Sequence, residues 1–497
     1  MSKHACSQCG RTMSQYNPDS RCAPCSRSGS EPVIPDRAWR DEGIYRALAA
    51  WDFATVLRLV RRRSGRSQKA VQELTTLTQS FISDLENDRK QVEGRETIIA
   101  LLTGLGLPVD LRQLLLAPFA QAEAERLSTA VDPALPWTAT RMVTALDAAA
   151  GGAMNGMNRR SVIAALGGAG LTQYVLQAAI APAEAMASTS GGGVRVSDEI
   201  LASLQDTTDA LRLADASHGS GTLARTARAH LKVLLGLLKE GSFNEATGRR
   251  LAAVTADTAI QTGWYLFDSG AHTAGQNLLL GALRAAHASG DSRLRAGALS
   301  FIAIHSYSAG DPRDAVTAAR TARQVIADQD APALHAMLLT RQARGHARLH
   351  EDRLALTALN EAEELCARGR GEDDPHWLYW INPGEVRGQT GSCYLDLGRP
   401  AQAAEAFAQA RGALGADDLR TRAQFLSRSA TAQMRAGDAD GGCATGHEVL
   451  SLVAGVQSAR LDENLATMLA EARQYRTTAP ARELLDRGHA VMRERAA

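Results

Sequence analysis

The chain has 497 residues, a formal net charge of +1, 45% hydrophobic residues and only 4% aromatic residues. A near-neutral charge excludes a general polyanion binder, so any basic surface must be local. The length predicts about three domains, and sparse strand signals predict an all-α class. The sequence contains no glycine-rich phosphate loop, paired-histidine zinc-protease motif or nucleophile elbow, and we therefore expect no enzyme.

Residues 1–30 hold two CxxC pairs, formed by Cys6, Cys9, Cys22 and Cys25. Two such pairs with twelve residues between them match a four-thiolate Zn²⁺ site, in which each pair binds one side of a tetrahedral ion. The alternative is two disulfides or reactive thiols. Because the chain begins without a secretory signal, we expect a reducing cytoplasm, which favours zinc. We predict a zinc-ribbon-like module that contacts DNA, braces a dimer or binds another protein.

Residues 31–130 predict a five-helix domain, in which a lead-in helix precedes four more helices. Gly65 ends the first of the four, and Ser67 and Thr78 stand where the second and third begin. The second and third helices are joined by a short connection at 75–77, which is the helix-turn-helix signature. Apolar residues at helical spacing form the predicted inner faces: Val56, Leu59, Val60, Val71, Leu74, Ile82, Leu85, Ile98, Leu101, Leu102 and Leu105.

The third of these four helices, which begins after Thr78, is the one that would enter the major groove of double-stranded DNA. Its outward residues are Gln79, Ser80, Ser83, Asp84 and Asn87. Glutamine pairs bidentately with adenine, whereas Asp84 would accept from cytosine and repel phosphate. Gln68 and Lys69 open the second helix, where phosphate contacts are favourable. Arg89 and Lys90 follow the third helix and would reach the DNA backbone.

Six basic residues and no acidic ones lie between Arg58 and Lys69. Such a run is typical either of a solvated helix face near a helix C-terminus or of a phosphate-binding surface. Beside a helix-turn-helix pattern, phosphate contact is the favoured interpretation.

The runs Gly65–Gln68 and Leu77–Asn87 resemble the Cro/C1-type helix-turn-helix family, over about 55 residues. The resemblance implies DNA contacts from the glutamine that opens the second helix and from the first residues of the third. On this sequence these positions are Gln68, Gln79, Ser80, Ser83 and Asp84. The chain departs from the family where Gln72, Thr76 and Asp88 replace a small alanine and two glycines. A degenerate motif that serves dimerisation or docking is therefore the alternative.

Residues 131–196 are expected to be a linker. The segment 158–163 and the apolar run after it resemble a twin-arginine export signal. Such signals stand at the N-terminus, however, and glycines, glutamines and a tyrosine interrupt the run. We therefore expect an interdomain helix and linker without membrane contact, against the alternative of a membrane-associated protein.

Residues 197–497 repeat a pattern of Ala-rich helices joined by Gly or acidic turns. The turns near Gly270, Gly310, Glu351, Gly398 and Gly437 are spaced by roughly 40 residues, which predicts a solenoid of helix pairs. The pattern resembles tetratricopeptide repeats, which implies a concave surface for a peptide or protein ligand. Candidate lining residues are Arg225, Arg228, His230, His272, His305, Arg341, His346, Arg387, Arg422 and Arg428. The aromatic cluster at 376–380 is expected in the core rather than in a ligand cage.

The order of these segments resembles the large regulators of actinomycetes and the peptide-sensing regulators of other Gram-positive bacteria. This resemblance implies a cytoplasmic transcriptional regulator that binds double-stranded DNA as a homodimer. Its repeat domain would sense a peptide, a small molecule or a protein partner. The alternative function is a protein–protein interaction scaffold with a degenerate helix-turn-helix.

Overall fold

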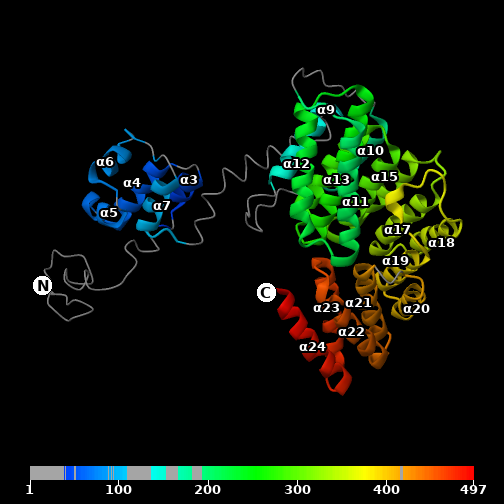
Figure 1. The fold of residues 1–497 in the computed structure, drawn as a ribbon. Coiled ribbons are helices and arrows are strands. Elements are labelled where there is room, and N and C mark those ends of the chain that lie inside the picture. The colour runs from blue at the N-terminus through cyan, green and yellow to red at the C-terminus, as the bar shows by residue number, and fades with distance from the viewer. Residues whose placement is uncertain are drawn as a thin grey trace. The chain divides into compact units, whose positions relative to one another are not determined.

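The computed structural model describes residues 39, 41–49, 52–65, 67–75, 77–87, 89–90, 92, 95–108, 136–152, 166–181, 193–414 and 418–496. The chain divides into two compact units, unit 1 within residues 1–123 and unit 2 within residues 124–497 (Figure 1). In the described ranges the only β-structure is an isolated bridge between Arg195 and Ser242. The fold is all-α, as the sequence predicts.

The described part of unit 1 forms five helices. Asp52 begins the second of them by accepting a hydrogen bond from the Thr55 amide at 3.0 Å, and Gly65 ends it in a left-handed conformation with φ of 66°. Apolar side chains from all five helices form one core, to which Trp39 also contributes. The helices are α3 (Glu42–Ala49), α4 (Phe53–Ser64), α5 (Gln68–Thr75), α6 (Gln79–Glu86) and α7 (Arg95–Gly104).

Gly104 allows α7 to approach α5. A Cβ at this position would overlap the backbone carbonyl of Leu74 and the Cα of Thr75, so only glycine permits this backbone distance. The last turn of α7 therefore lies directly against the last turn of α5.

Unit 2 consists of helices joined by short turns. In chain order they are α9 (Ala139–Gly152), α10 (Ala169–Ile180), α11 (Asp198–His218), α12 (Leu223–Glu240), α13 (Glu245–Asp268), α14 (His272–Ser289), α15 (Ser292–Ala309), α16 (Pro312–Val325), α17 (Pro332–Arg348), α18 (Asp352–Ala367), η2 (His376–Leu378), α19 (Pro383–Asp396), α20 (Pro400–Arg411), α21 (Leu419–Arg435), α22 (Ala439–Leu452), η3 (Val453–Gly455), α23 (Ala459–Ala472), η4 (Arg473–Tyr475) and α24 (Ala479–Ala496).

From α13 to α24 successive helices pack as hairpin pairs, with a short turn within each pair. The turns at Gly270, Gly310, Gly398 and Gly437 fall inside pairs, as the spacing predicts. The pair α17–α18 has no glycine at its turn, and His350 there adopts a φ of 57°. Among the described residues it is the only non-glycine with positive φ, so helix packing imposes the turn on a residue that resists it.

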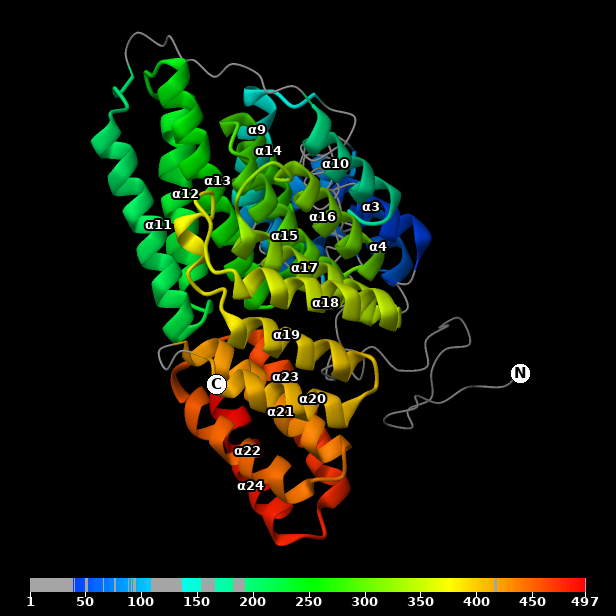
Figure 2. The same cartoon turned by 90° about the vertical axis from the view of Figure 1, so that its right-hand side faces the viewer.

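The first helices of the pairs form a continuous inner row. The chain of contacts runs α11, α13, α15, α17, α19, α21 and α23, and α11 also contacts α21. The amide of Gln457 donates to the carbonyl of His218 at 2.8 Å, which ties the end of α11 to the start of α23. Figure 2 shows the segment that carries η2 beside α11, and His376 Nε2 lies 3.2 Å from Asp209 Oδ2. The inner row therefore curves until its ends meet.

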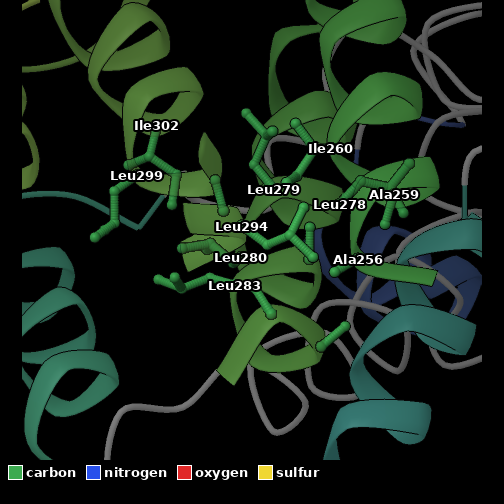
Figure 3. Packing of buried hydrophobic residues seen from close by; sticks show 14 of the residues in the cluster. Ala256, Ala259, Ile260, Leu278, Leu279, Leu280, Leu283, Leu294, Leu299 and Ile302 are labelled. Atoms are coloured by element: carbon green, nitrogen blue, oxygen red, sulfur yellow. The ribbon is translucent and has the colours of Figure 1, made fainter. Parts of the chain in front are cut away.

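The core of unit 2 includes the region where α13, α14 and α15 meet. Ile260, Leu279 and Leu283 are almost fully buried there, with alanines filling the spaces between the leucines (Figure 3). A Cβ at Gly275 would lie 2.8 Å from the carbonyl oxygen of Gly263. These two glycines allow α13 and α14 to approach more closely than larger residues would.

Two helices from the stretch 131–196, which we expected to be a linker, pack into this core. α9 contacts α12 and α14, and α10 contacts α14 and α16. Tyr174 of α10 donates to the Leu280 carbonyl and accepts from Arg284 Nε, both at 2.9 Å. The pattern did not indicate this packing because the apolar residues of α10 acquire their partners only from helices about a hundred residues later. The twin-arginine-like segment 158–163 lies outside the described residues. None of the helices in the described ranges has the length and apolarity to cross a bilayer.

We expect Leu283→Ala to lower the free energy of unfolding of unit 2 by about 2–5 kcal/mol, because the substitution leaves a cavity in a closely packed core. Urea unfolding followed by circular dichroism measures the change. Leu213→Ala is the matched control, since Leu213 is 59% exposed, and its effect should stay within about 0.5 kcal/mol. Equal losses in both variants would contradict the placement of Leu283 in the core.

Candidate functional site

The helix-turn-helix is formed by α5, the connection after it, and α6. Ser67 Oγ accepts from the Ala70 amide at 3.2 Å, and Thr78 Oγ1 accepts from the Phe81 amide at 3.2 Å. Both predicted caps are therefore in place. Ile82 and Leu85 of α6 are buried in the core, so the opposite side of α6 faces outward.

Glu86 at the end of α6 joins three helices. Its carboxylate accepts from Arg61 of α4, with Nε at 2.5 Å from Oε1 and Nη2 at 3.0 Å from Oε2. It also accepts from Gln68 Nε2 of α5 at 2.7 Å, and its backbone carbonyl accepts from Arg58 Nη1 at 3.1 Å. Glu86 is only 8% exposed, so these bonds replace the water that a carboxylate requires.

The predicted base-contacting residues lie on the outward side of α6. Gln79, Ser80 and Asn87 are exposed, while Ser83 is half-buried. The Asn87 amide donates to the Ser83 carbonyl at 2.7 Å, which caps the C-terminal end of the helix. Gln79 and Ser80 are therefore the two exposed polar side chains at the N-terminal end of α6.

Asp84 carries a negative charge on the face that would approach DNA. Lys90 Nζ lies 3.4 Å from its Oδ2, and the same ammonium lies 5.7 Å from the centre of the Phe81 ring. The pair offsets the charge of Asp84 next to the predicted base-contacting side chains. Arg89 is exposed beside Lys90.

The basic run on α4 is partly used within unit 1. Arg58 and Arg61 bind Glu86, and Arg63 forms an ion pair with Asp41. Arg62 and Lys69 are exposed. Much of the run therefore stabilises the unit, in contrast to the phosphate contacts expected for the whole run.

Gln68 is predicted to contact phosphate, and in this structure its side-chain amide donates to Glu86. No role was predicted for Glu86 from the sequence. A signal was present, because Glu86 follows Ile82 and Leu85 on the inner face of α6, where an acidic residue needs a partner. Arg58 and Arg61, spaced by three residues, supply that partner from one face of α4.

Unit 2 encloses two adjoining cavities along its inner row of helices. The first, of about 110 Å³, is lined by aromatic residues that include Trp264, Phe301 and Trp377, and we call it the aromatic cavity. The second, of about 310 Å³, is lined by Arg344, Arg348, Arg428 and Arg460, and we call it the arginine cavity. Both are lined by Tyr307, Gln389, Gln424, Phe425 and Arg460.

Few of the residues predicted for the concave surface lie at these cavities. Arg341 lines the aromatic cavity, and His272 and Arg428 line the arginine cavity. Arg228 instead donates to the Ala150 carbonyl at 3.0 Å and so contacts α9. His346 Nδ1 lies 2.6 Å from Glu351 Oε2. Other arginines that line the arginine cavity, Arg344, Arg348 and Arg460, were not predicted. They lie on the first helices of pairs, and this position was the only feature of the sequence that could have indicated them.

The aromatic cluster 376–380 has a double role. Trp377 is 7% exposed, and a Cβ at Gly297 would lie 3.3 Å from its ring, as expected for a core residue. Trp377, Tyr379 and Trp380 also line the aromatic cavity, so the cluster closes one side of it.

The four predicted zinc ligands, Cys6, Cys9, Cys22 and Cys25, lie outside the described residues. Within the described ranges, no group of three or more His, Cys, Asp or Glu side chains is arranged to hold a metal ion. Thr76 and Asp88, two of the departures from the Cro/C1 pattern, also lie outside these ranges.

We expect Glu86→Ala to destabilise unit 1 by about 1–3 kcal/mol, because Arg61 and Gln68 then lose their common acceptor in a half-buried place. Hydrogen exchange of peptides from α5 and α6 measures the loss as faster exchange. Glu73→Ala is the matched control, since Glu73 is exposed on α5. Unchanged exchange in the Glu86 variant would mean that the carboxylate does not hold the three helices together.

Comparison with known proteins agrees with this geometry. Residues 52–115 match a protein family described as a helix-turn-helix domain. The match begins at the N-cap of α4 and includes α5, α6 and α7. A search of curated proteins found no match. The helix-turn-helix prediction is confirmed: the chain contains a helix-turn-helix domain at residues 52–115.

Proposed function

We propose that this protein is a DNA-binding transcriptional regulator, in which α6 enters the major groove of double-stranded DNA. The observation that carries this proposal is the exposed pair Gln79 and Ser80 at the N-terminal end of α6, in a segment that matches the helix-turn-helix family. The N-terminal residues of a recognition helix are those that contact base edges. The bonds from Glu86 to α4 and α5 support a rigid presentation of this helix.

The proposed contacts fall into two groups. Gln79 and Ser80 contact bases, with Ser83 and Asn87 at the edge of the same face. Lys69, Arg89 and Lys90, together with Arg62, contact phosphates. Gln68 acts by positioning α5 through Glu86, and the Lys90 pair keeps Asp84 from repelling the DNA backbone.

The Cro/C1-type resemblance supports a homodimer that binds two half-sites one helical turn apart. We expect a protein with this role to be located in the cytoplasm. We propose no catalytic activity for it. We propose that the repeats of unit 2 are tetratricopeptide-like and bind a ligand that controls DNA binding. The support for ligand binding is the pair of cavities along the inner row of helices.

We further propose that Cys6, Cys9, Cys22 and Cys25 bind one Zn²⁺ ion. Two CxxC pairs supply four thiolates, which is a donor set that zinc prefers in structural sites. Zinc would supply the folding energy of a module too small to have a hydrophobic core.

In vitro site selection with the zinc-loaded full chain should enrich a short motif with two-fold symmetry. The double variant Gln79→Ala, Ser80→Ala should bind that motif about tenfold more weakly or worse, because bidentate base contacts are lost. Electrophoretic mobility shift measures the affinities. Gln72→Ala is the matched control, since Gln72 is exposed on α5 and makes no proposed base contact.

Two results would contradict DNA recognition by α6. One is a failure to enrich any motif, which would favour a scaffold that binds protein partners. The other is an affinity that does not change with salt, because each phosphate contact should contribute about 0.9 to the slope of log K against log salt.

Metal analysis of the purified full chain should give one zinc per chain. Cys9→Ser should lose most of it, because three thiolates hold zinc far less tightly than four. Cys366→Ser is the control, since Cys366 is a half-buried free thiol of unit 2, and its zinc content should equal that of the wild type. Absence of zinc together with four oxidised N-terminal thiols would indicate the disulfide alternative.

A further inference from the structure

The arginine cavity holds more positive charge than its acidic residues offset. Arg344 Nη2 lies 2.9 Å from Asp396 Oδ2, and Arg428 Nη2 lies 3.3 Å from Asp396 Oδ1. One carboxylate thus serves two guanidinium groups. Arg348, which is exposed, adds a further charge at the same cavity, and the other acidic lining residue, Glu463, is exposed to solvent.

Arg460 has an even weaker partner. Its Nη1 lies 3.8 Å from Asp268 Oδ1, and its guanidinium lies 5.2 Å from the Trp264 ring centre. Burial raises the pKa of the Asp268 carboxyl, which weakens it as a counter-ion. Asp268 is also shared, because the cation of Arg420 lies close enough to lower its pKa.

Electrostatics at Arg428 reflect this excess of cations. Burial, and next the neighbouring charge of Arg344, lower the pKa of Arg428 to about 10. The group remains protonated at neutral pH, so the cavity keeps its positive charge there. An anion placed between these guanidinium groups would relieve their repulsion.

Unused donors point to the same chemistry. Among the described residues, the buried Nε atoms of Arg344 and Arg428 have no hydrogen-bond partner, and neither does Nε2 of Gln424, which lines the cavity as well. A buried donor without an acceptor is unfavourable, because it loses its hydrogen bond to water and gains none in return. Phosphate and carboxylate oxygens are the acceptors that match the fork of N–H groups on arginine.

Size and closure limit what the cavity can accept. Its volume of about 310 Å³ is at the lower end of the range for small-molecule sites. The contact between α11 and α21 brings the two ends of the inner row together. The adjoining aromatic cavity shares Phe425 and Tyr307 with it and would accept an apolar group beside the charged one.

We propose that the arginine cavity binds a small organic anion, whose phosphate or carboxylate group contacts Arg344, Arg428 and Arg460 and whose apolar part extends toward Trp264 and Phe301. The inference rests on the ligand-binding role proposed above for unit 2, and it names the ligand class.

Isothermal titration calorimetry of the full chain without DNA tests the proposal, with phenyl phosphate, benzoate and neutral benzyl alcohol as probes at constant ionic strength. We expect saturable binding of one anion per chain and none of benzyl alcohol. Binding of phenyl phosphate alone identifies a phosphate ligand, and binding of benzoate alone identifies a carboxylate ligand.

Arg428→Gln should weaken anion binding by about tenfold or more, because a charge-assisted hydrogen bond is lost. Arg348→Gln should weaken it less, and it removes a charge from an exposed side chain at the same cavity. Arg435→Gln is the matched control on α21, since Arg435 pairs with Glu471 at 2.7 Å away from the cavity, and it should bind as the wild type does.

The proposal is overturned if neither anion binds the wild-type chain, or if Arg428→Gln and Arg348→Gln both bind with unchanged affinity. Circular dichroism checks that Arg428→Gln is folded. If that variant does not fold, unchanged anion binding by Arg348→Gln alone contradicts the proposal. The double variant Gln79→Ala, Ser80→Ala should bind the anion normally. A failure of the DNA-binding proposal would therefore not affect the anion-binding measurement. Likewise, a failure to bind anions would not affect the DNA-binding measurement.

Discussion

The geometry of the helix-turn-helix unit depends on the burial of one carboxylate. Glu86 is almost excluded from water, and such a group is stable only when positive or polar donors surround it. The donors come from α4 and α5, through Arg61 and Gln68. The same bonds that satisfy Glu86 therefore fix the angle between the helix that precedes the turn and the helix that would contact DNA. They also explain why much of the basic run on α4 is not available to phosphate.

Close backbone approach is the corresponding constraint in unit 2. Glycine and alanine replace large side chains where α13 and α14 meet, and Gly263 and Gly275 face each other there. Small residues bring the helices close, and leucines such as Leu279 and Leu283 are buried between them (Figure 3). This packing continues from pair to pair and returns α11 to α21. A curved row of helices thus acquires an interior that can be both polar and enclosed.

That interior contains several arginines, of which Arg344, Arg348, Arg428 and Arg460 line one cavity. Guanidinium groups tolerate burial when they stack on aromatic rings or pair with carboxylates, and Arg344 and Arg460 do both, against Tyr307 and Trp264 respectively. An interior built for stability alone would match each cation with an acid or replace both by apolar residues. The surplus of donors at Arg428 instead agrees with a site that an anion completes.

The sequence by itself determined the all-α class, the helix-turn-helix and the turns of the repeat pairs. These features depend on short-range physics, because a cap such as Thr78 and a left-handed glycine such as Gly398 act within a few residues. The outward position of Gln79 also followed from helical periodicity alone. The zinc ligands stay a prediction from spacing.

Only the tertiary structure decided which polar residues are used internally. The partners of Glu86 come from other helices, α10 gains its core from α14 and α16, and the arginine cavity joins α17, α21 and α23. A buried charge is specified by groups far away in the chain, and the period of a single helix carries no information about them. The apolar pattern therefore located the helices, whereas the pairing of their charges required the folded chain.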